Sequence, residues 1–134
     1  VQSLAGDSVL VTGTVPDVRP YLQHAAVVVA PLRVARGIQN KILEAMAMAR
    51  PVVAAQSCVA AIDAQAGQEL LGAESVADYV TAVARLLENT SEADAIGAAG
   101  RQRVLASYSW AAHLSRIDRY LSPSAPSSSN KSAT

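Results

Sequence analysis

The sequence predicts an α/β fold: a Rossmann-like parallel sheet flanked by helices. Two short valine-rich runs, residues 26–30 and 51–55, have the character of parallel strands that are buried on both faces. The stretch between them follows the period of an amphipathic helix of about twelve residues, and Pro51 ends it because proline cannot continue a helix. Strand, helix and strand in this order form a βαβ unit, in which ligands bind where the first strand ends and the helix begins.

The composition supports this fold class and excludes several functions. The chain has 134 residues, enough for one compact domain or part of a larger one, and 51% of them are hydrophobic but only 4% aromatic. A formal net charge of zero gives no reason to expect a nucleic acid partner. One cysteine fits a reducing cytoplasm, and with only two histidines it argues against a structural metal site. No apolar run reaches the roughly 18 residues of a membrane helix, so we expect a cytoplasmic protein, at most peripheral to the inner face of the membrane.

The rest of the chain alternates short strand and helix patterns. Ser75 and Asp78 have the spacing of a capping box at the start of a helix. We expect that helix to bury an apolar stripe consisting of Val76, Val80, Val83 and Leu87. The other expected elements are a strand at 8–13, a helix at 18–24, a loop at 56–68 with at most one short strand near 59–62, an edge strand at 69–73, helices at 92–107 and 110–121, and a disordered Ser/Pro/Ala-rich tail at 122–134.

The junction between the strand at 26–30 and its helix has the features of an anion site. Gly37 allows close approach of a ligand to the backbone, and the first turn of the helix presents unpaired N–H groups. Four of the 11 basic residues of the chain fall within residues 33–50, against a single acidic residue. These are Arg33, Arg36, Lys41 and Arg50. A phosphate or diphosphate would suit this site.

Glu44 adds a second kind of ligand contact. In the predicted helix, Ile38, Ile42, Ala45 and Ala49 form the stripe that faces the core, flanked by Leu43 and Met46. Arg36, Asn40 and Glu44 lie four residues apart and therefore share another face. A carboxylate in this apolar helix needs a polar partner, because an unpaired buried charge is costly. Either it pairs with Lys41 or Arg36, or it accepts hydrogen bonds from ligand hydroxyls beside the phosphate site.

The run from Gly37 to Ala47, followed by residues 50–53, resembles a known sequence pattern. It is similar to the nucleotide-sugar-binding helix of retaining GT-B glycosyltransferases of the family-4-like group. Within that group it resembles the sugar transferases of bacterial exopolysaccharide and PEP-CTERM sorting systems. Residues 108–110 also resemble the aromatic-Ser-Trp start of the C-terminal helix of that family. The resemblance covers about residues 8–121 and implies a partial C-terminal, donor-binding domain.

The resemblance implies specific roles. In the family the loop and helix N-terminus hold the donor diphosphate, and two glutamates grip the sugar and the ribose. Glu44 matches the ribose glutamate, whereas the sugar glutamate would fall at position 36, which is arginine here. The loop after the first predicted strand lies near the base, and the turn containing Gln56 and Ser57 lies near the donor sugar. The implied substrate-binding residues are therefore Arg33, Arg36, Gly37, Ile38, Gln39, Asn40, Lys41, Glu44, Gly13 and Thr14.

On this interpretation the parent enzyme transfers a sugar from a UDP- or GDP-sugar to a hydroxyl acceptor in surface polysaccharide biosynthesis, with retention and without a further cofactor or metal. The acceptor domain is expected to lie outside the chain, so that the chain alone is inactive and could dimerise through the surface that truncation exposes. No residue is assigned a catalytic role. Two alternatives stay open: a GT-B nucleotide-sugar epimerase, and a non-catalytic α/β interaction or receiver-like module.

Overall fold

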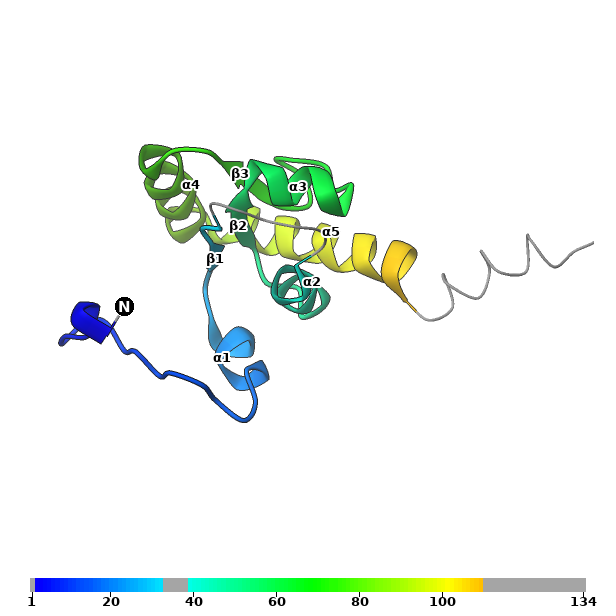
Figure 1. The fold of residues 1–134 in the computed structure, drawn as a ribbon. Helices are drawn as coiled ribbons and strands as arrows, with labels where there is room; N and C mark the ends of the chain where they lie inside the picture. Colours follow the sequence, from blue (N-terminus) through cyan, green and yellow to red (C-terminus); the bar gives the residue numbers. More distant parts are fainter. Residues whose placement is uncertain (1, 33–38, 110–134) are drawn as a thin grey trace, which may run out of the picture.

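The computed structural model describes residues 2–32 and 39–109 of the chain. A short 3₁₀ turn, η1 (Gln2–Leu4), is followed by alternating helices and strands (Figure 1). The helices are α1 (Arg19–His24), α2 (Asn40–Ala47), α3 (Gln56–Ile62), α4 (Val76–Glu88) and α5 (Thr90–Tyr108), and the strands are β1 (Val28–Ala30), β2 (Val52–Ala55) and β3 (Leu71–Ala73). The predicted α/β class is confirmed.

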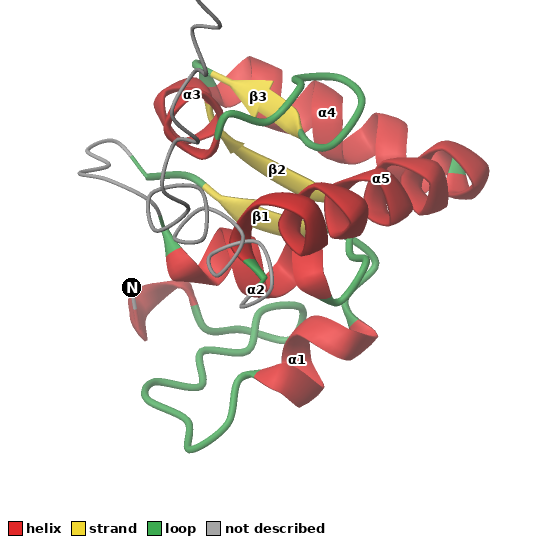
Figure 2. Cartoon of the chain, turned by 90° about the vertical axis from the view of Figure 1, so that its right-hand side faces the viewer, coloured by secondary structure: helices red, strands yellow, loops and turns green. Residues whose placement is uncertain are grey.

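The three described strands form one parallel sheet in the order β1-β2-β3, with β2 in the centre (Figure 2). Val28 is in register with Val52, and Val53 with Leu71. β1, α2 and β2 are the βαβ unit predicted from the sequence, and the strand expected at 69–73 is confirmed as β3, an edge strand of this sheet. Because all three strands run in the same direction, their carboxyl ends meet at one edge of the sheet.

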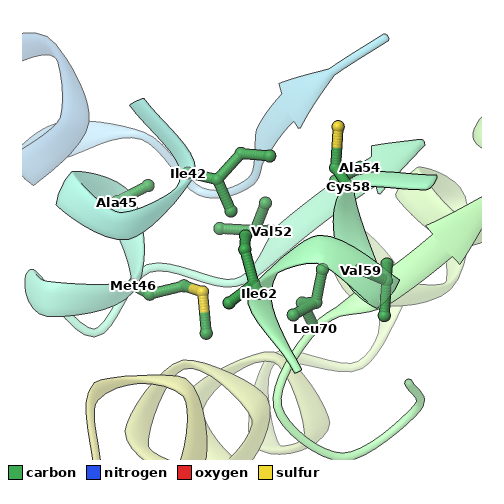
Figure 3. Close-up of a cluster of buried hydrophobic side chains, with 9 residues drawn as sticks. All are labelled: Ile42, Ala45, Met46, Val52, Ala54, Cys58, Val59, Ile62 and Leu70. Carbon is green, nitrogen blue, oxygen red and sulfur yellow. The ribbon is translucent and has the colours of Figure 1, made fainter. Parts of the chain in front are cut away.

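Helices cover both faces of the sheet, because successive side chains of a strand point to opposite faces. On one face Val52 and Ala54 pack with residues of α2 and α3 in the core cluster of Figure 3. This cluster consists of Ile42, Ala45, Met46, Val52, Ala54, Cys58, Val59, Ile62 and Leu70. On the other face Val53 packs with residues of β3, α4 and the start of α5. The central strand is therefore buried on both sides, as its uninterrupted apolar sequence predicts.

α5 seals the amino edge of the sheet, and two glycines allow it to approach closely. A Cβ on Gly97 would lie 2.2 Å from the carbonyl oxygen of Ala49, and one on Gly100 would lie 2.7 Å from that of Glu69. Arg103 then pairs with Glu69 through Nε and Oε2 at 2.9 Å, and Arg101 donates to the carbonyl of Ala47. The residues just before β2 and β3 are thus fixed against α5.

Several predicted elements are confirmed with shifted ends. α1 begins at Arg19, where Asp17 accepts a hydrogen bond from the Arg19 N–H at 3.0 Å. α4 ends at Glu88, and the side chain of Asn89 accepts from the N–H of Glu92 at 3.1 Å, so α5 begins slightly earlier than predicted. In α2 the stripe prediction holds for Ile42 and Ala45, and Met46 is fully buried as well.

Two predictions are wrong. Residues 56–62, expected to be loop, form α3, because Cys58, Val59 and Ile62 fall on one helical face and are buried against the sheet. Residues 8–13, expected to be a strand, form no ladder with any described strand, and Leu10 is 82% exposed. An apolar run becomes a strand only where a neighbouring strand can pair with its backbone.

The expected buried stripe of α4 is confirmed only at Val83, which packs against the core, and is wrong at its other three positions. Val76 is 78% exposed and Val80 is 63% exposed, whereas Leu86 is buried. The face that packs on the sheet is made by Tyr79, Ala82, Val83 and Leu86. This helix is apolar on two neighbouring faces, and packing against β3 and α5 selects one of them. The predicted helix at 110–121 and the predicted tail at 122–134 lie outside the described residues.

Candidate functional site

The carboxyl edge of the sheet opens onto a cavity of about 820 Å³, here called the larger cavity. Each strand contributes the residues that follow it: Pro31 and Leu32 follow β1, Gln56 and Ser57 follow β2, and Glu74 and Ser75 follow β3. Ala55, Ala73, Val76 and Tyr79 complete the lining. In open parallel sheets this edge is where ligands bind, because loops and helix starts converge there.

The N-terminus of α4, at the wall of this cavity, is closed by its own side chains. Ser75 Oγ accepts a hydrogen bond from the Asp78 N–H at 3.2 Å, and Asp78 Oδ2 accepts from the N–H groups of Ser75 and Glu74 at 2.8 and 3.1 Å. These hydrogen bonds, above all that from the Ser75 backbone, lower the pKa of Asp78. The predicted capping box is confirmed. An anion would have to compete with Asp78 for these donors.

Tyr79 ties α4 to the end of β1. Its hydroxyl donates to the carbonyl oxygen of Ala30 at 3.4 Å, and the N–H of Leu32 donates to the same oxygen at 2.9 Å. Burial raises the pKa of Tyr79, so the hydroxyl keeps its proton across the neutral range. The turn at Pro31, through which the chain leaves β1, is therefore held from two sides.

A second, smaller cavity of about 260 Å³ lies between α1, β1 and α2. Its walls are apolar, and the only charged groups among the described residues that line it are Lys41 and Glu44 of α2. The complete lining is Val18, Leu22, Val28, Val29, Ala30, Pro31, Leu32, Lys41, Ile42 and Glu44. Pro31 and Leu32 belong to both cavities, so the two hollows adjoin along the turn that Tyr79 holds.

Glu44 and Lys41 are exposed side chains of neighbouring turns. Within residues 2–32 and 39–109, Glu44 forms no ion pair, so the predicted bridge to Lys41 is not present. The other proposed partner, Arg36, lies outside the described residues. An exposed carboxylate at the rim of an apolar cavity is free to accept hydrogen bonds from ligand hydroxyls.

The structure brings only some of the predicted site residues together. Lys41 and Glu44 line the smaller cavity, and Gln39 and Asn40 form the start of α2 beside them. Gly13 and Thr14 are exposed in the coil before α1 and line neither cavity. The φ angle of +66° at Gly13 is a sufficient reason for a glycine there. Arg33, Arg36, Gly37 and Ile38 lie outside the described residues.

The sequence prediction missed the contribution of β3 and α4. Glu74, Val76 and Tyr79 line the larger cavity, but none of them was expected at the site. Gln56 and Ser57 were indicated only by the family resemblance. The available signal was positional: polar residues follow the ends of both β2 and β3, and the ends of parallel strands share one edge.

The part of the chain that the structure describes has neither a metal-binding cluster nor a membrane-spanning helix. No three His, Cys, Asp or Glu side chains of this part of the chain are grouped so that they could hold a metal ion. Of the helices that the structure describes, none is long and apolar enough to cross a membrane.

Comparison with known protein families gives a match. The sequence model of the family described as Glycosyl transferases group 1 matches residues 1–89, which include both cavities and everything from η1 to α4. No curated protein matches the chain, and no solved structure does.

Proposed function

The chain belongs to the group 1 glycosyl transferases, and on that premise we propose that it forms the donor side of a glycosyl transfer reaction. The donor is a nucleotide diphosphate sugar, UDP- or GDP-linked, and the acceptor is a hydroxyl group. The transfer proceeds with retention at the anomeric carbon, in the cytoplasm, and serves the assembly of a surface polysaccharide of the exopolysaccharide type. Residues 1–121 make up part of one domain of the enzyme, and the acceptor side is supplied elsewhere.

The observation that carries this proposal is the pair of adjoining cavities at the carboxyl ends of the strands. The smaller one has apolar walls and an exposed carboxylate, Glu44, at its rim. Apolar walls suit the flat face of a base, and a carboxylate suits the ribose hydroxyls. The larger one is lined by more polar groups, including Gln56, Ser57 and Glu74, and suits the sugar.

The chemistry required of such a site is mainly electrostatic. The bond between the sugar and the diphosphate breaks as negative charge develops on the leaving diphosphate, and groups that stabilise this charge accelerate the step. We propose that Lys41, the N–H groups at the start of α2 and the basic residues Arg33 and Arg36 supply this stabilisation, with Gly37, Ile38, Gln39 and Asn40 close to the phosphates. Glu44 orients the nucleoside and takes no part in bond cleavage.

The proposal is tested by calorimetric titration of the chain with UDP, GDP, UDP-glucose and GDP-mannose. We expect one nucleotide series to bind, and the replacement Glu44→Ala to weaken it by about 1 kcal/mol or more, the value of a hydrogen bond to a charged group. Glu88→Ala, which removes an exposed carboxylate at the end of α4, is the matched control and should leave the affinity unchanged. A folded chain that binds none of these ligands, or binds them equally well without Glu44, contradicts the proposed site.

A further inference from the structure

The outer side of α4 carries an apolar stripe that is largely exposed, here called the α4 stripe. Val76, Val80 and Leu87 are 78%, 63% and 55% exposed, and Val83, the fourth member, is half-buried. α4 forms the outer layer of the molecule on its side of the sheet (Figure 1). Large apolar side chains that are exposed in a row on one helix indicate a surface that binds a partner.

The spacing of the α4 stripe indicates that this partner is another helix. Its four residues are separated by four, three and four positions, which is the alternation of the a and d positions of a coiled coil. This alternation keeps the side chains on one side of the helix, so that they can pack against a second helix along its length. Ala77 and Ala84, which are exposed beside the stripe, are small and uncharged and allow the two backbones to approach each other.

The charges of α4 favour a second copy of the same helix in antiparallel orientation. Antiparallel pairing about the middle of the stripe places Val76 of one copy opposite Leu87 of the other. It also brings Asp78, near the start of the helix, level with Arg85 of the other copy, so that opposite charges are adjacent. Parallel pairing would instead bring each of these charges level with its own copy, and like charges repel. The helix dipoles likewise favour the antiparallel arrangement, because their opposite ends are then adjacent.

We propose that the α4 stripe is a dimer interface, in which α4 packs antiparallel against α4 of a second copy of this chain. Such an interface is closed and two-fold symmetric, because each copy contributes the same surface. With 13 residues, α4 is about 20 Å long, so the dimer buries less than the roughly 1,200 Å² of a standard interface and is a weak one. The inference goes beyond the proposed function and involves no ligand, so either can fail without the other.

Sedimentation equilibrium of the unmodified chain tests the proposal. We expect the mean mass to rise from 13.9 kDa towards twice this value with increasing concentration, with a dissociation constant of about 10–100 µM, as suits a small interface. Val80→Lys places an ammonium group in the middle of the apolar contact and should weaken the dimer at least about tenfold, because this charge would lose its hydration. Because Val80 is exposed, the variant should keep the thermal unfolding midpoint of the unmodified chain.

Leu87→Lys is a second variant of the stripe and should weaken the dimer in the same way, since Leu87 is also exposed. Leu105→Lys is the matched control, because Leu105 is an exposed apolar residue of α5, outside the stripe. It should leave the dissociation constant unchanged. A folded chain that stays monomeric up to about 1 mM overturns the proposal. A dimer that neither stripe variant weakens overturns it as well, because the contact would then lie elsewhere.

Disulfide cross-linking with oxidised glutathione tests the orientation of the two helices. A mixture of the Val76→Cys and Leu87→Cys variants should form a mixed disulfide, because the two positions face each other in the antiparallel pair. Either variant alone should not cross-link, because its two copies would lie about 16 Å apart along the helix axis, too far for a disulfide. The native Cys58 is buried and does not compete. Cross-linking of each variant with itself, without the mixed product, overturns the antiparallel arrangement.

Discussion

The two edges of the sheet differ in what they are built from. At the amino edge, α5 approaches so closely at Gly97 and Gly100 that a single added carbon would meet backbone carbonyls. At the carboxyl edge the strands end in polar and exposed residues, among them Gln56 and Glu74, around the larger cavity. One edge is closed by packing, and the other is left open around a cavity.

Because of this difference, we expect the residues that determine stability and the residues that bind the ligand to lie at opposite ends of the same strands. Substitutions at the amino edge should change the free energy of unfolding and leave binding unchanged. Substitutions of the side chains that line the larger cavity should do the reverse, because side chains that face an open cavity have few packing contacts to lose. The predictions below are given in order of decreasing effect, and those for Gly97 and the two tyrosines test this division.

Gly97→Ala should have the largest effect. Its Cβ would lie 2.2 Å from the carbonyl oxygen of Ala49 and 2.9 Å from the carbonyl carbon, so α5 must move away from the amino edge. Overpacking of this kind costs about 1–3 kcal/mol, and backbone atoms yield less readily than side chains. Urea denaturation should show this loss, with the affinity of the folded chain for its ligand unchanged.

The control for this prediction is Gly6→Ala. No atom lies within 4 Å of a Cβ at this position, so the added methyl group should change the unfolding free energy little. A Gly97→Ala variant as stable as the unmodified chain would show that α5 does not pack against the backbone in this way.

Tyr79 and Tyr108 allow the two edges to be compared by the same chemical change. Each donates its hydroxyl to a backbone carbonyl: Tyr79 to Ala30 at 3.4 Å, and Tyr108 to Ile62 at 2.9 Å. Tyr108→Phe should lower the unfolding free energy by about 1 kcal/mol, the usual value of a hydrogen bond, without affecting ligand affinity.

Tyr79→Phe should have the opposite effects: it should change the unfolding free energy little and should weaken ligand binding. The Ala30 carbonyl keeps the N–H of Leu32 as a donor, so little stability is lost. The turn at Pro31 is shared by both cavities, and its loosening should weaken nucleotide-sugar binding about two- to fivefold, within the value of one hydrogen bond. Equal effects of the two phenylalanine variants on binding would contradict the separation of the edges.

The βαβ unit was predictable from the sequence because its signals are local. Valine-rich runs, the helical period and Pro51 each act within a few residues, and all three agree in residues 26–55. The capping box of Ser75 and Asp78 is equally local and is confirmed. The position of Glu44 at a cavity rim agrees with the prediction that it faces away from the core.

The wrong predictions concern segments whose structure depends on contacts with residues that are distant in the sequence. The four residues of the predicted stripe of α4 have the period of a helix, but the alternative face containing Tyr79 and Leu86 has the same period. Only contacts with β3 and α5 choose between them. Residues 8–13 have strand composition and no described strand to pair with. The close approach of the Gln56 side chain to Gly72 joins residues that are far apart in the sequence, and no local pattern reveals it.

Ala49→Gly should stabilise the chain slightly. Ala49, two residues after α2, has a φ angle of +55°, and the N–H of Arg50 donates to the carbonyl of Ala45 at 3.0 Å, as in a Schellman motif. The left-handed conformation costs a residue with a Cβ about 1–2 kcal/mol, and the extra freedom of glycine in the unfolded chain returns about 0.4–1 kcal/mol of this. The net gain should be about 0.5 kcal/mol in urea denaturation.

Asp63→Gly is the matched comparison for this prediction, because Asp63 ends α3 with the same φ angle of +55°. Aspartate tolerates the left-handed conformation better than alanine, so its replacement should gain less. A loss of stability in Ala49→Gly would mean that its methyl group contributes more by packing than its backbone conformation costs.

The smallest predicted effect is that of a substitution in the N-terminal cap of α4, and its size depends on pH. Hydrogen bonds, chiefly from the backbone of Ser75, lower the pKa of Asp78 in the folded state below its ordinary value. A carboxylate with a lowered folded pKa contributes its stability above the unfolded pKa and loses it as the pH falls through the folded pKa. Asp78→Asn should therefore reduce the unfolding free energy at pH 7, and the difference from the unmodified chain should shrink as the pH falls below about 4.

Asp94→Asn, which replaces an exposed carboxylate on α5, serves as the control. Because Asp78 also places a negative charge at the start of α4, its variant has a second use. If the phosphates of the donor bound to α4, removal of this charge would strengthen nucleotide binding, because the carboxylate would no longer repel the phosphates. If the phosphates bind at α2, as proposed, the affinity for the nucleotide stays the same while the free energy of unfolding falls. The affinity of this one variant therefore shows whether the diphosphate binds at α2 or at α4.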